Sequence, residues 1–259
     1  MPDRLEGLPV RRPVFALLFL LVAAPCAAHE QTLDNGLRVV LIPHHANPMV
    51  ASAVVVGAGV VDEPQVGSGA SHFLEHLLFD GTETRSQRQL YDDADRIGAY
   101  NNATTREDHT LFTLLVAKEY AETGLALQAD MLFHSTIPAE SFEKERKIVL
   151  EELARDRSDP SYDLETAFRA MAYAGTPIAR PVLGTEASLA SMTRAQVLAY
   201  YNARYVPANM TLVVMGDFEL QEMQGAVAFG AAPNVRFTAA SISGTSKSPI
   251  TTSVMFAGT

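Results

Sequence analysis

The chain has 259 residues and a formal net charge of −10, from 30 acidic and 20 basic residues. This length suits one large domain or two small ones, and a hydrophobic share of 47% is enough to form a core. Because the balance is acidic and no basic stripe is present, we expect no nucleic-acid partner.

The first 28 residues have the pattern of a secretory signal peptide. Two arginines precede an unbroken apolar run at 14–24, and small residues then favour cleavage after Ala28. An uncleaved anchor is the alternative, although the run is short for a bilayer span. Cys26, the only cysteine, would leave with the signal, and Pro25 beside it disfavours a lipoprotein site. We expect a periplasmic or secreted protein without disulfides, and without a membrane span once the signal is removed.

Two short strands open the mature domain. The turn signal Asn35-Gly36 precedes an apolar strand over 37–42, and a second, valine-rich strand follows over 49–56. His44 and His45 lie between the strands. A pair of loop histidines could take up a metal adventitiously, but we interpret them as surface residues.

The segment Ser71–Phe79 carries the strongest chemical signal. His72 and His76 are four residues apart, so on a helix they lie on one face and aim at one point, which Glu75 borders. Two imidazoles suit Zn²⁺, and a carboxylate beside the metal suits a general base for water, in the order H-x-x-E-H. The alternative is a pair of satisfied core histidines. Because the surroundings are apolar, three buried polar groups would be costly without a shared partner, which favours a metal.

A hairpin is expected after the next helix. Ser86 can cap a helix that runs to Ile97. The polar segment 99–105 and the apolar segment 110–116 then follow as the two expected strands of the hairpin. A polar strand beside an apolar one suggests that the polar member lies at the edge of a sheet, where an edge is either blunted or used.

Further elements follow in order along the chain. The pattern predicts helices over 120–133, 138–157, 162–173, 194–202 and 220–229, with a strand over 210–215. Residues from 231 onward are rich in small and polar residues, and the last seven look like a strand.

A third metal ligand is expected from the 138–157 helix. Glu151 stands at helical spacing from basic residues and should lie on a solvated face. Glu145 and Glu152, seven residues apart, share an apolar stripe with Ile148 and Val149. Inward carboxylates seldom occur without a partner, so Glu152 is the predicted third ligand. Glu145 is predicted to orient a ligand, with an ordinary buried carboxylate as the alternative.

Five stretches together resemble the pitrilysin/insulinase family of zinc metallopeptidases, which includes the mitochondrial processing peptidase. They cover most of residues 33 to 220, and are Leu33–Leu41, the motif helix with Gly81-Thr82, Asn102–Thr104, Lys144–Glu152 and much of Leu198–Asp217. The family places its glutamate ligand 76 or 77 residues beyond the second histidine, which agrees with the position of Glu152 relative to His76.

The resemblance implies a site and a fold. It implies that His72, His76 and Glu152 bind Zn²⁺ and that Glu75 activates water. It also implies that Glu145 contacts a zinc ligand without binding the zinc itself. The implied fold is α+β, a largely antiparallel or mixed sheet with helices packed on it.

The resemblance also implies a substrate and a partner. A peptide would add as a β-strand along the edge at Asn102 and Ala103. Family members build a closed chamber from two homologous halves, and the second half supplies an Arg and a Tyr that hold substrate and oxyanion. Residues 29–230 then correspond to the catalytic N-terminal half, and 231–259 to a linker or the start of a truncated second half.

Three candidate functions are compatible with the sequence. The first is a zinc-dependent endopeptidase, or its catalytic half, that acts on peptides or unfolded segments. The second is a non-catalytic or partner-dependent subunit of a two-half peptidase. The third, a zinc-storage module, is disfavoured because Glu75 would have no task there. The peptidase is favoured because all four expected site residues are present. They are His72, Glu75, His76 and Glu152.

Overall fold

The computed structural model describes residues 28–64 and 68–230, so the predicted signal sequence and the 231–259 segment lie outside the described residues. Its strands are β1 (His29–Thr32), β2 (Arg38–Pro43), β3 (Met49–Val56), β4 (Tyr100–Thr105), β5 (Thr110–Ala117) and β6 (Met210–Gly216). Its α-helices are α1 (Ala70–Leu77), α2 (Gln87–Arg96), α3 (Ala121–Phe133), α4 (Ala139–Arg157), α5 (Tyr162–Ala172), α6 (Glu186–Ser191), α7 (Arg194–Arg204) and α8 (Leu220–Gly230). Among these residues no helix is long and apolar enough to cross a membrane.

The six strands form one sheet in the order β1-β2-β6-β3-β5-β4. Only β2 and β6 run parallel; the other neighbouring pairs are antiparallel. The predicted α+β fold with a largely antiparallel, mixed sheet is therefore confirmed. Residues 100–105 of the predicted 99–105 segment form edge strand β4, as the contrast between this polar segment and the apolar 110–116 segment indicated.

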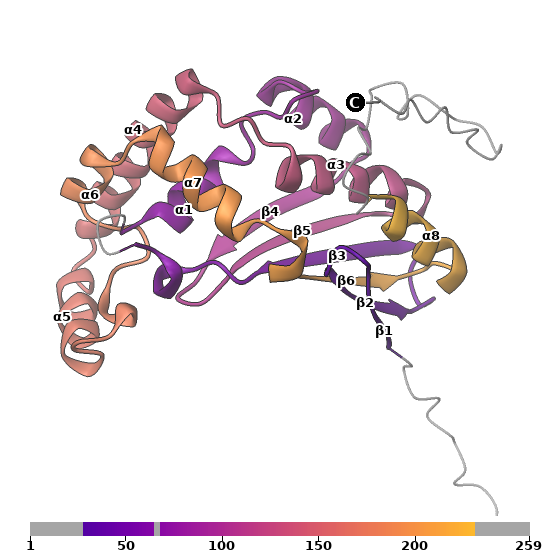
Figure 1. Ribbon diagram of the computed structural model, residues 1–259, viewed down its shortest axis with the longest axis horizontal. Helices are drawn as coiled ribbons and strands as arrows, with labels where there is room; N and C mark the ends of the chain where they lie inside the picture. The colour runs from indigo at the N-terminus through magenta and orange to yellow at the C-terminus, as the bar shows by residue number, and fades with distance from the viewer. Residues whose placement is uncertain (1–27, 65–67, 231–259) are drawn as a thin grey trace, which may run out of the picture.

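The core lies between the sheet and the helices. Alternate residues of β3 are buried, and the residues between them stay partly accessible, which is the pattern of a sheet covered on one face. Figure 1 shows the helices gathered on one side of the sheet, with α3 and α8 over its right-hand part. Helix α1 contacts α4, α7, β4 and β5, and most of its residues are buried, so the motif helix is held in the interior.

The start of α1 is fixed by a carboxylate from the preceding loop. Glu63 is buried and accepts hydrogen bonds from the backbone N–H groups of Gly69 (2.9 Å) and Ser71 (2.8 Å). These groups have no partner within the helix, and a negative charge suits this end of its dipole. Gly69 has φ +91°, and a Cβ there would lie 2.6 Å from the Leu183 carbonyl oxygen, so this close approach requires glycine.

Several sequence predictions need correction. The motif helix ends at Leu77, three residues before the expected end near Asp80. Pro138 caps α4 from outside and is not its first residue. Ile148 is 38% exposed, whereas Val149 is buried, so the apolar stripe of α4 is narrower than predicted. Helix α6 was not expected, because its six residues carry little apolar periodicity.

We predict that Glu63→Ala destabilises the protein more than Glu63→Gln. The alanine variant leaves two buried N–H groups without an acceptor, at about 1–3 kcal/mol for each unsatisfied group, whereas glutamine keeps one acceptor oxygen. Urea unfolding of the three proteins measures the difference. Equal midpoints for the wild type and the alanine variant would show that Glu63 does not hold the helix.

Candidate metal centre

Helices α1 and α4 bring three donor groups together. His72 and His76 project from successive turns of α1, with ring centroids 4.8 Å apart at an interplanar angle of 65°. Oε2 of Glu152 on α4 lies 3.7 Å from Nε2 of His72 and 3.6 Å from Nε2 of His76. In the described part of the chain, these three residues form a group that could hold a metal ion.

The geometry and chemistry of this group fit zinc. With zinc–ligand bonds of about 2.0–2.1 Å, ligand atoms at tetrahedral corners lie about 3.4 Å apart, close to the separations seen here. Oε2 of Glu152 is buried and has no hydrogen-bond partner among the described residues, while Oε1 accepts from Arg155 at 3.4 Å. A buried carboxylate oxygen without a donor, facing two imidazole nitrogens, is suited to a cation.

Glu145 contacts the outer side of His76. Its Oε2 lies 3.2 Å from Nδ1 of His76, and its Oε1 lies 3.2 Å from Nζ of Lys144. Burial opposes the ionised form, but these contacts hold the pKa of Glu145 below its usual value. An acceptor on Nδ1 favours the tautomer whose Nε2 carries the free lone pair. Glu145 therefore lies within contact of His76, and its role in orienting that ligand stays a prediction.

The two histidines differ in their protonation. Burial, with a smaller contribution from His76, lowers the pKa of His72 to about 4, so its ring is neutral at pH 7. Burial also opposes the charge on His76, but its contacts with Glu145 and Glu152 prevail and raise its pKa. A proton therefore competes with a metal chiefly at His76.

Glu75 lies beside the donor group and is held by a hydroxyl. Thr105, the last residue of β4, donates from Oγ1 to Oε2 of Glu75 at 2.5 Å. Burial raises the pKa of Glu75, against the opposing effects of Thr105 and His76. A carboxyl whose pKa is raised toward neutrality is better matched to proton transfer than an exposed one.

The predicted substrate-binding residues lie on the edge strand. Asn102 is exposed, donates to the Tyr100 hydroxyl at 3.0 Å, and accepts at its backbone oxygen from the Thr113 hydroxyl. Ala103 is partly buried against the core on the helix side. Because β4 pairs with β5 alone, its outer backbone edge is directed away from the sheet.

The sequence prediction missed Thr105, Lys144 and Asp80. Asp80 is 3% exposed and accepts a hydrogen bond from Gln87, whose Oε1 accepts from Lys144. Burial, reinforced by Glu145, raises the pKa of Asp80 to about 6. For Thr105 a signal was present: it shares a face of the strand with Ala103, two residues before it.

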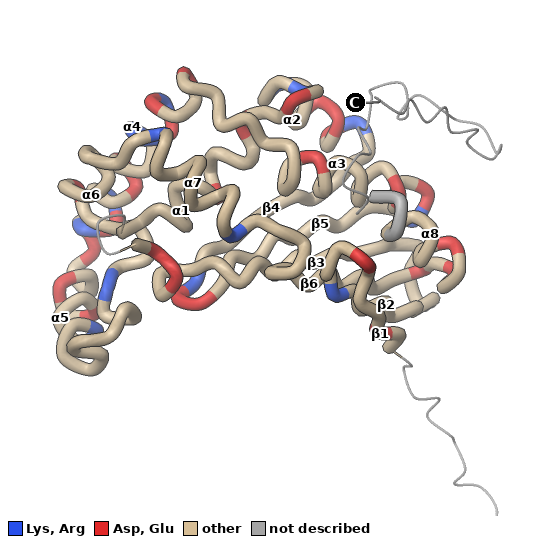
Figure 2. The backbone as a smooth tube through the Cα atoms, viewed as in Figure 1, with Lys and Arg blue, Asp and Glu red and all other residues tan. Residues whose placement is uncertain are grey.

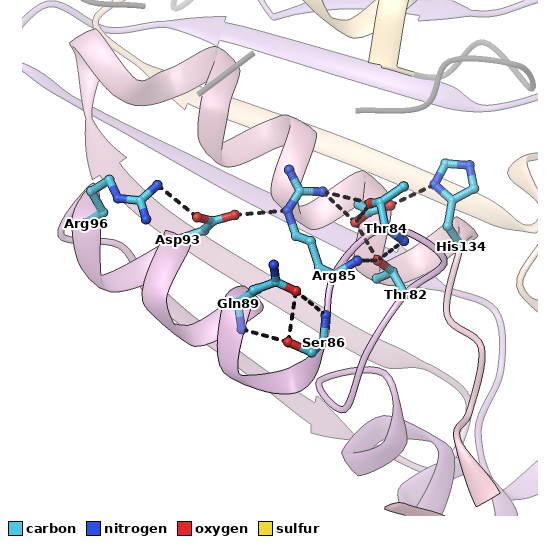
Figure 3. Close-up of polar contacts among 9 residues, drawn as sticks. Thr82, Thr84, Arg85, Ser86, Gln89, Asp93, Arg96 and His134 are labelled. Carbon is cyan, nitrogen blue, oxygen red and sulfur yellow. Dashed lines mark hydrogen bonds and ion pairs between the residues drawn. The ribbon is translucent and has the colours of Figure 1, made fainter. Parts of the chain in front are cut away.

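The other histidines belong to different surroundings. His44 and His45 are exposed, as predicted, and His45 contacts Asp217 at 2.6 Å. His134 closes α3 and contacts Asp130, which also accepts from Arg85 and Thr82 (Figure 3). Arg85 also donates to Asp93 of α2 at 3.0 Å, so this polar cluster joins α2 to α3. Figure 2 shows basic residues scattered among acidic ones.

Comparison with known proteins matches the part of the chain that contains the candidate site. The sequence model of the insulinase family, peptidase family M16, matches residues 38–186, a span that contains α1, α4 and β4. The chain belongs to this insulinase peptidase family. The model of the family's inactive domain (Peptidase M16 inactive domain) matches residues 191–229.

Insulinase-family relatives include bacterial and mitochondrial proteins. An "uncharacterized zinc protease" of Mycobacterium leprae is 37% identical over 74% of this chain and 43% of its own length. A "probable mitochondrial-processing peptidase subunit beta" of Schizosaccharomyces pombe is 35% identical over 85% of this chain and 47% of its own. The chain thus spans a little under half the length of these relatives.

Solved structures share the fold. A protease from Helicobacter pylori superposes with a TM-score of 0.77 at 24% identity, over 80% of this chain and 50% of that one. The first half of the periplasmic protease PqqL from Escherichia coli gives 0.74 at 26% identity, over 79% and 45%. An inactive domain from Pseudomonas fluorescens gives 0.75 at 18% identity. The fold alone therefore does not decide activity, and the residues of the site must.

We predict that Glu152→Gln lowers zinc stoichiometry from about one per chain to near zero, because an amide oxygen is a weaker ligand than a carboxylate. Zinc is measured by plasma emission after dialysis against the free ion. Glu151→Gln, on the exposed face of the same helix, should keep its zinc. Full zinc retention by Glu152→Gln would remove Glu152 from the ligand set.

We predict that His76 in the zinc-free protein keeps its proton to a higher pH than His72. The raised pKa of His76 depends on the Glu145 carboxylate, so Glu145→Gln should lower it and leave His72 neutral down to about pH 4. Long-range ¹⁵N–¹H NMR of the rings follows both titrations. Two rings that titrate together near the ordinary value would contradict the geometry of the site. Zinc affinity should correspondingly fall as the pH is lowered through the pKa of His76.

Proposed function

We propose that this chain is the catalytic half of a zinc-dependent endopeptidase, with His72, His76 and Glu152 as the zinc ligands and Glu75 as the general base. The observation that carries the proposal is the convergence of two Nε2 atoms on one buried carboxylate oxygen. Zinc protease relatives at up to 37% identity over three quarters of the chain support the metal and the reaction class.

The residues divide the chemistry between them. When bound, zinc would supply Lewis-acid chemistry, which polarises a carbonyl oxygen and makes a water more acidic at neutral pH. The Glu75 carboxylate would accept a proton from a water molecule as the water oxygen attacks the scissile carbonyl carbon. The same carboxyl would return the proton to the amide nitrogen as the carbon–nitrogen bond breaks. Glu145 would keep His76 oriented throughout.

The edge strand supplies a place for an extended peptide. A substrate that adds outside β4 would hydrogen-bond along Asn102 and Ala103 through its backbone. Strand addition would recognise the substrate mainly through backbone hydrogen bonds and less through side chains. It therefore suits peptides and unfolded segments that can become extended. A folded protein could not present a free strand in this way without opening locally.

A second homologous half would complete the enzyme. The relatives are about twice as long as the matched region, and the superposed PqqL segment is the first half of its protein. We assign residues 29–230 to the catalytic half and 231–259 to a linker or the start of the second half. The N-terminal pattern supports export to the periplasm or the exterior. A partner-dependent, non-catalytic subunit is the second candidate, because an inactive domain shares this fold.

We predict that Glu75→Gln retains one zinc and lowers peptide cleavage by about 10²-fold or more, the scale of general base catalysis. Cleavage of a quenched-fluorescence peptide library is measured at equal zinc content, with and without a candidate second-half protein. Glu140→Gln, an exposed change at the start of α4, serves as the control and should match the wild type. Absence of cleavage by the wild type in both conditions would support the non-catalytic alternative.

A further inference from the structure

We propose that Thr105 is the positioning residue for Glu75, so that strand β4 sets the placement of the general base as well as that of the substrate. The proposal rests on the proposed function. Its basis is one short contact, the 2.5 Å hydrogen bond from Oγ1 of Thr105 to Oε2 of Glu75, made by a threonine that is only 7% exposed.

The contact assigns different tasks to the two carboxylate oxygens of Glu75. A carboxylate accepts at both oxygens, and the Thr105 hydroxyl occupies Oε2. Each carboxylate oxygen has two lone pairs, so Oε1, which this hydroxyl does not touch, keeps more capacity to accept a proton from water. Without this contact a glutamate side chain, with three rotatable bonds, would spread over several rotamers. Threonine is stiff about χ1, so its hydroxyl follows the backbone of the strand closely.

The end of β4 is itself anchored. Thr105 pairs in register with Thr110, whose Oγ1 donates to the Ala58 backbone oxygen at 2.8 Å. The hairpin closes one residue further on, where the N–H of Arg106 donates to the His109 oxygen at 2.8 Å. The hydroxyl that holds Glu75 therefore sits at a fixed point of the sheet and not in a loop.

The same strand carries the proposed substrate edge two residues earlier. Residues alternate in direction along a strand, so Ala103 and Thr105 share the face that packs toward the helices. A peptide paired with the outer edge of β4 and a carboxylate bonded to Thr105 would both take their position from one backbone. Because Glu75 extends from α1, this hydrogen bond would hold its carboxylate at a set distance from a peptide paired with β4, which proton transfer requires.

Thr105→Val and Thr105→Ser test the proposal as a matched pair. Valine keeps the branched shape and removes the donor, whereas serine keeps the donor. Thr105→Ala also removes the donor and asks for no additional space, so it replaces valine if that variant does not fold. Thr211→Val makes the same exchange on β6, which β3 and β5 separate from β4, and serves as the control.

We expect valine and alanine at position 105 to lower kcat about 10–100-fold, which is less than the roughly 10²–10⁴-fold that a general base contributes in full. KM should change less than about threefold and zinc content should stay at one per chain, because the substrate edge and the ligands are intact. Serine should restore kcat to within about threefold of the wild type. Wild-type kcat in the valine or alanine variant, or a loss of activity that serine does not rescue, would overturn the proposal.

A structural measurement separates this proposal from the proposed function. Crystal structures of zinc-loaded wild type and Thr105→Val are compared at the Glu75 side chain. We expect the carboxylate to lie against Thr105 in the wild type and to leave that position in the valine variant. An unchanged carboxylate would overturn the proposal even if the wild type cleaves peptides. If the wild type cleaves nothing, the proposed function fails, and the position of Glu75 in the two structures still decides the role of Thr105.

Discussion

The placement of the three candidate metal ligands depends on the packing of α1 against α4. The contact is apolar at its centre, where the rings of Phe73 and Phe142 lie 5.0 Å apart and Val149 is buried. The guanidinium of Arg146 lies 4.8 Å from the Phe142 centroid and donates to the Met192 oxygen at 2.7 Å, which ties α4 to the end of α6. Burial of these side chains places two imidazoles opposite one carboxylate.

That arrangement is unfavourable without a shared partner. The His72 ring is buried enough to resist protonation, and the Glu152 oxygen that faces both rings lacks a hydrogen-bond donor in the described structure. Such groups are costly to remove from water unless a cation or hydrogen bonds compensate. The apolar contact provides the favourable free energy that holds them together, and a metal would relieve the remaining cost.

The sequence was sufficient for those parts of the site that depend on helical spacing. The four-residue interval of His72 and His76 and the seven-residue interval of Glu145 and Glu152 each place their side chains on one face of a helix, whatever the tertiary context. Ile148 shows the limit of this argument, because the width of a buried stripe depends on what packs against it. The sequence favours Glu152 over Glu151 because basic residues stand at helical spacing from Glu151, although one of them, Arg155, contacts Glu152 in the structure.

The contacts from the sheet needed the structure. Thr105 meets Glu75 only because β4 pairs with β5 in one register and α1 crosses that end of the strand. Burial raises the pKa of Asp80, and the carboxylate of Glu145, 65 residues further along the chain, reinforces the shift. Strand alternation could place Thr105 on the same face as Ala103, but no periodicity in the sequence reveals either contact. An inactive domain shares this fold, so the fold says less about catalysis than the side chains of the site do. Those side chains are His72, Glu75, His76 and Glu152.

The most direct test of the account is an anomalous diffraction map of the zinc-loaded protein, collected above and below the zinc absorption edge. We predict one strong peak about 2.0–2.2 Å from Nε2 of His72, Nε2 of His76 and a carboxylate oxygen of Glu152. A peak at another position, or no peak between these three groups in a crystal grown with zinc, would contradict it.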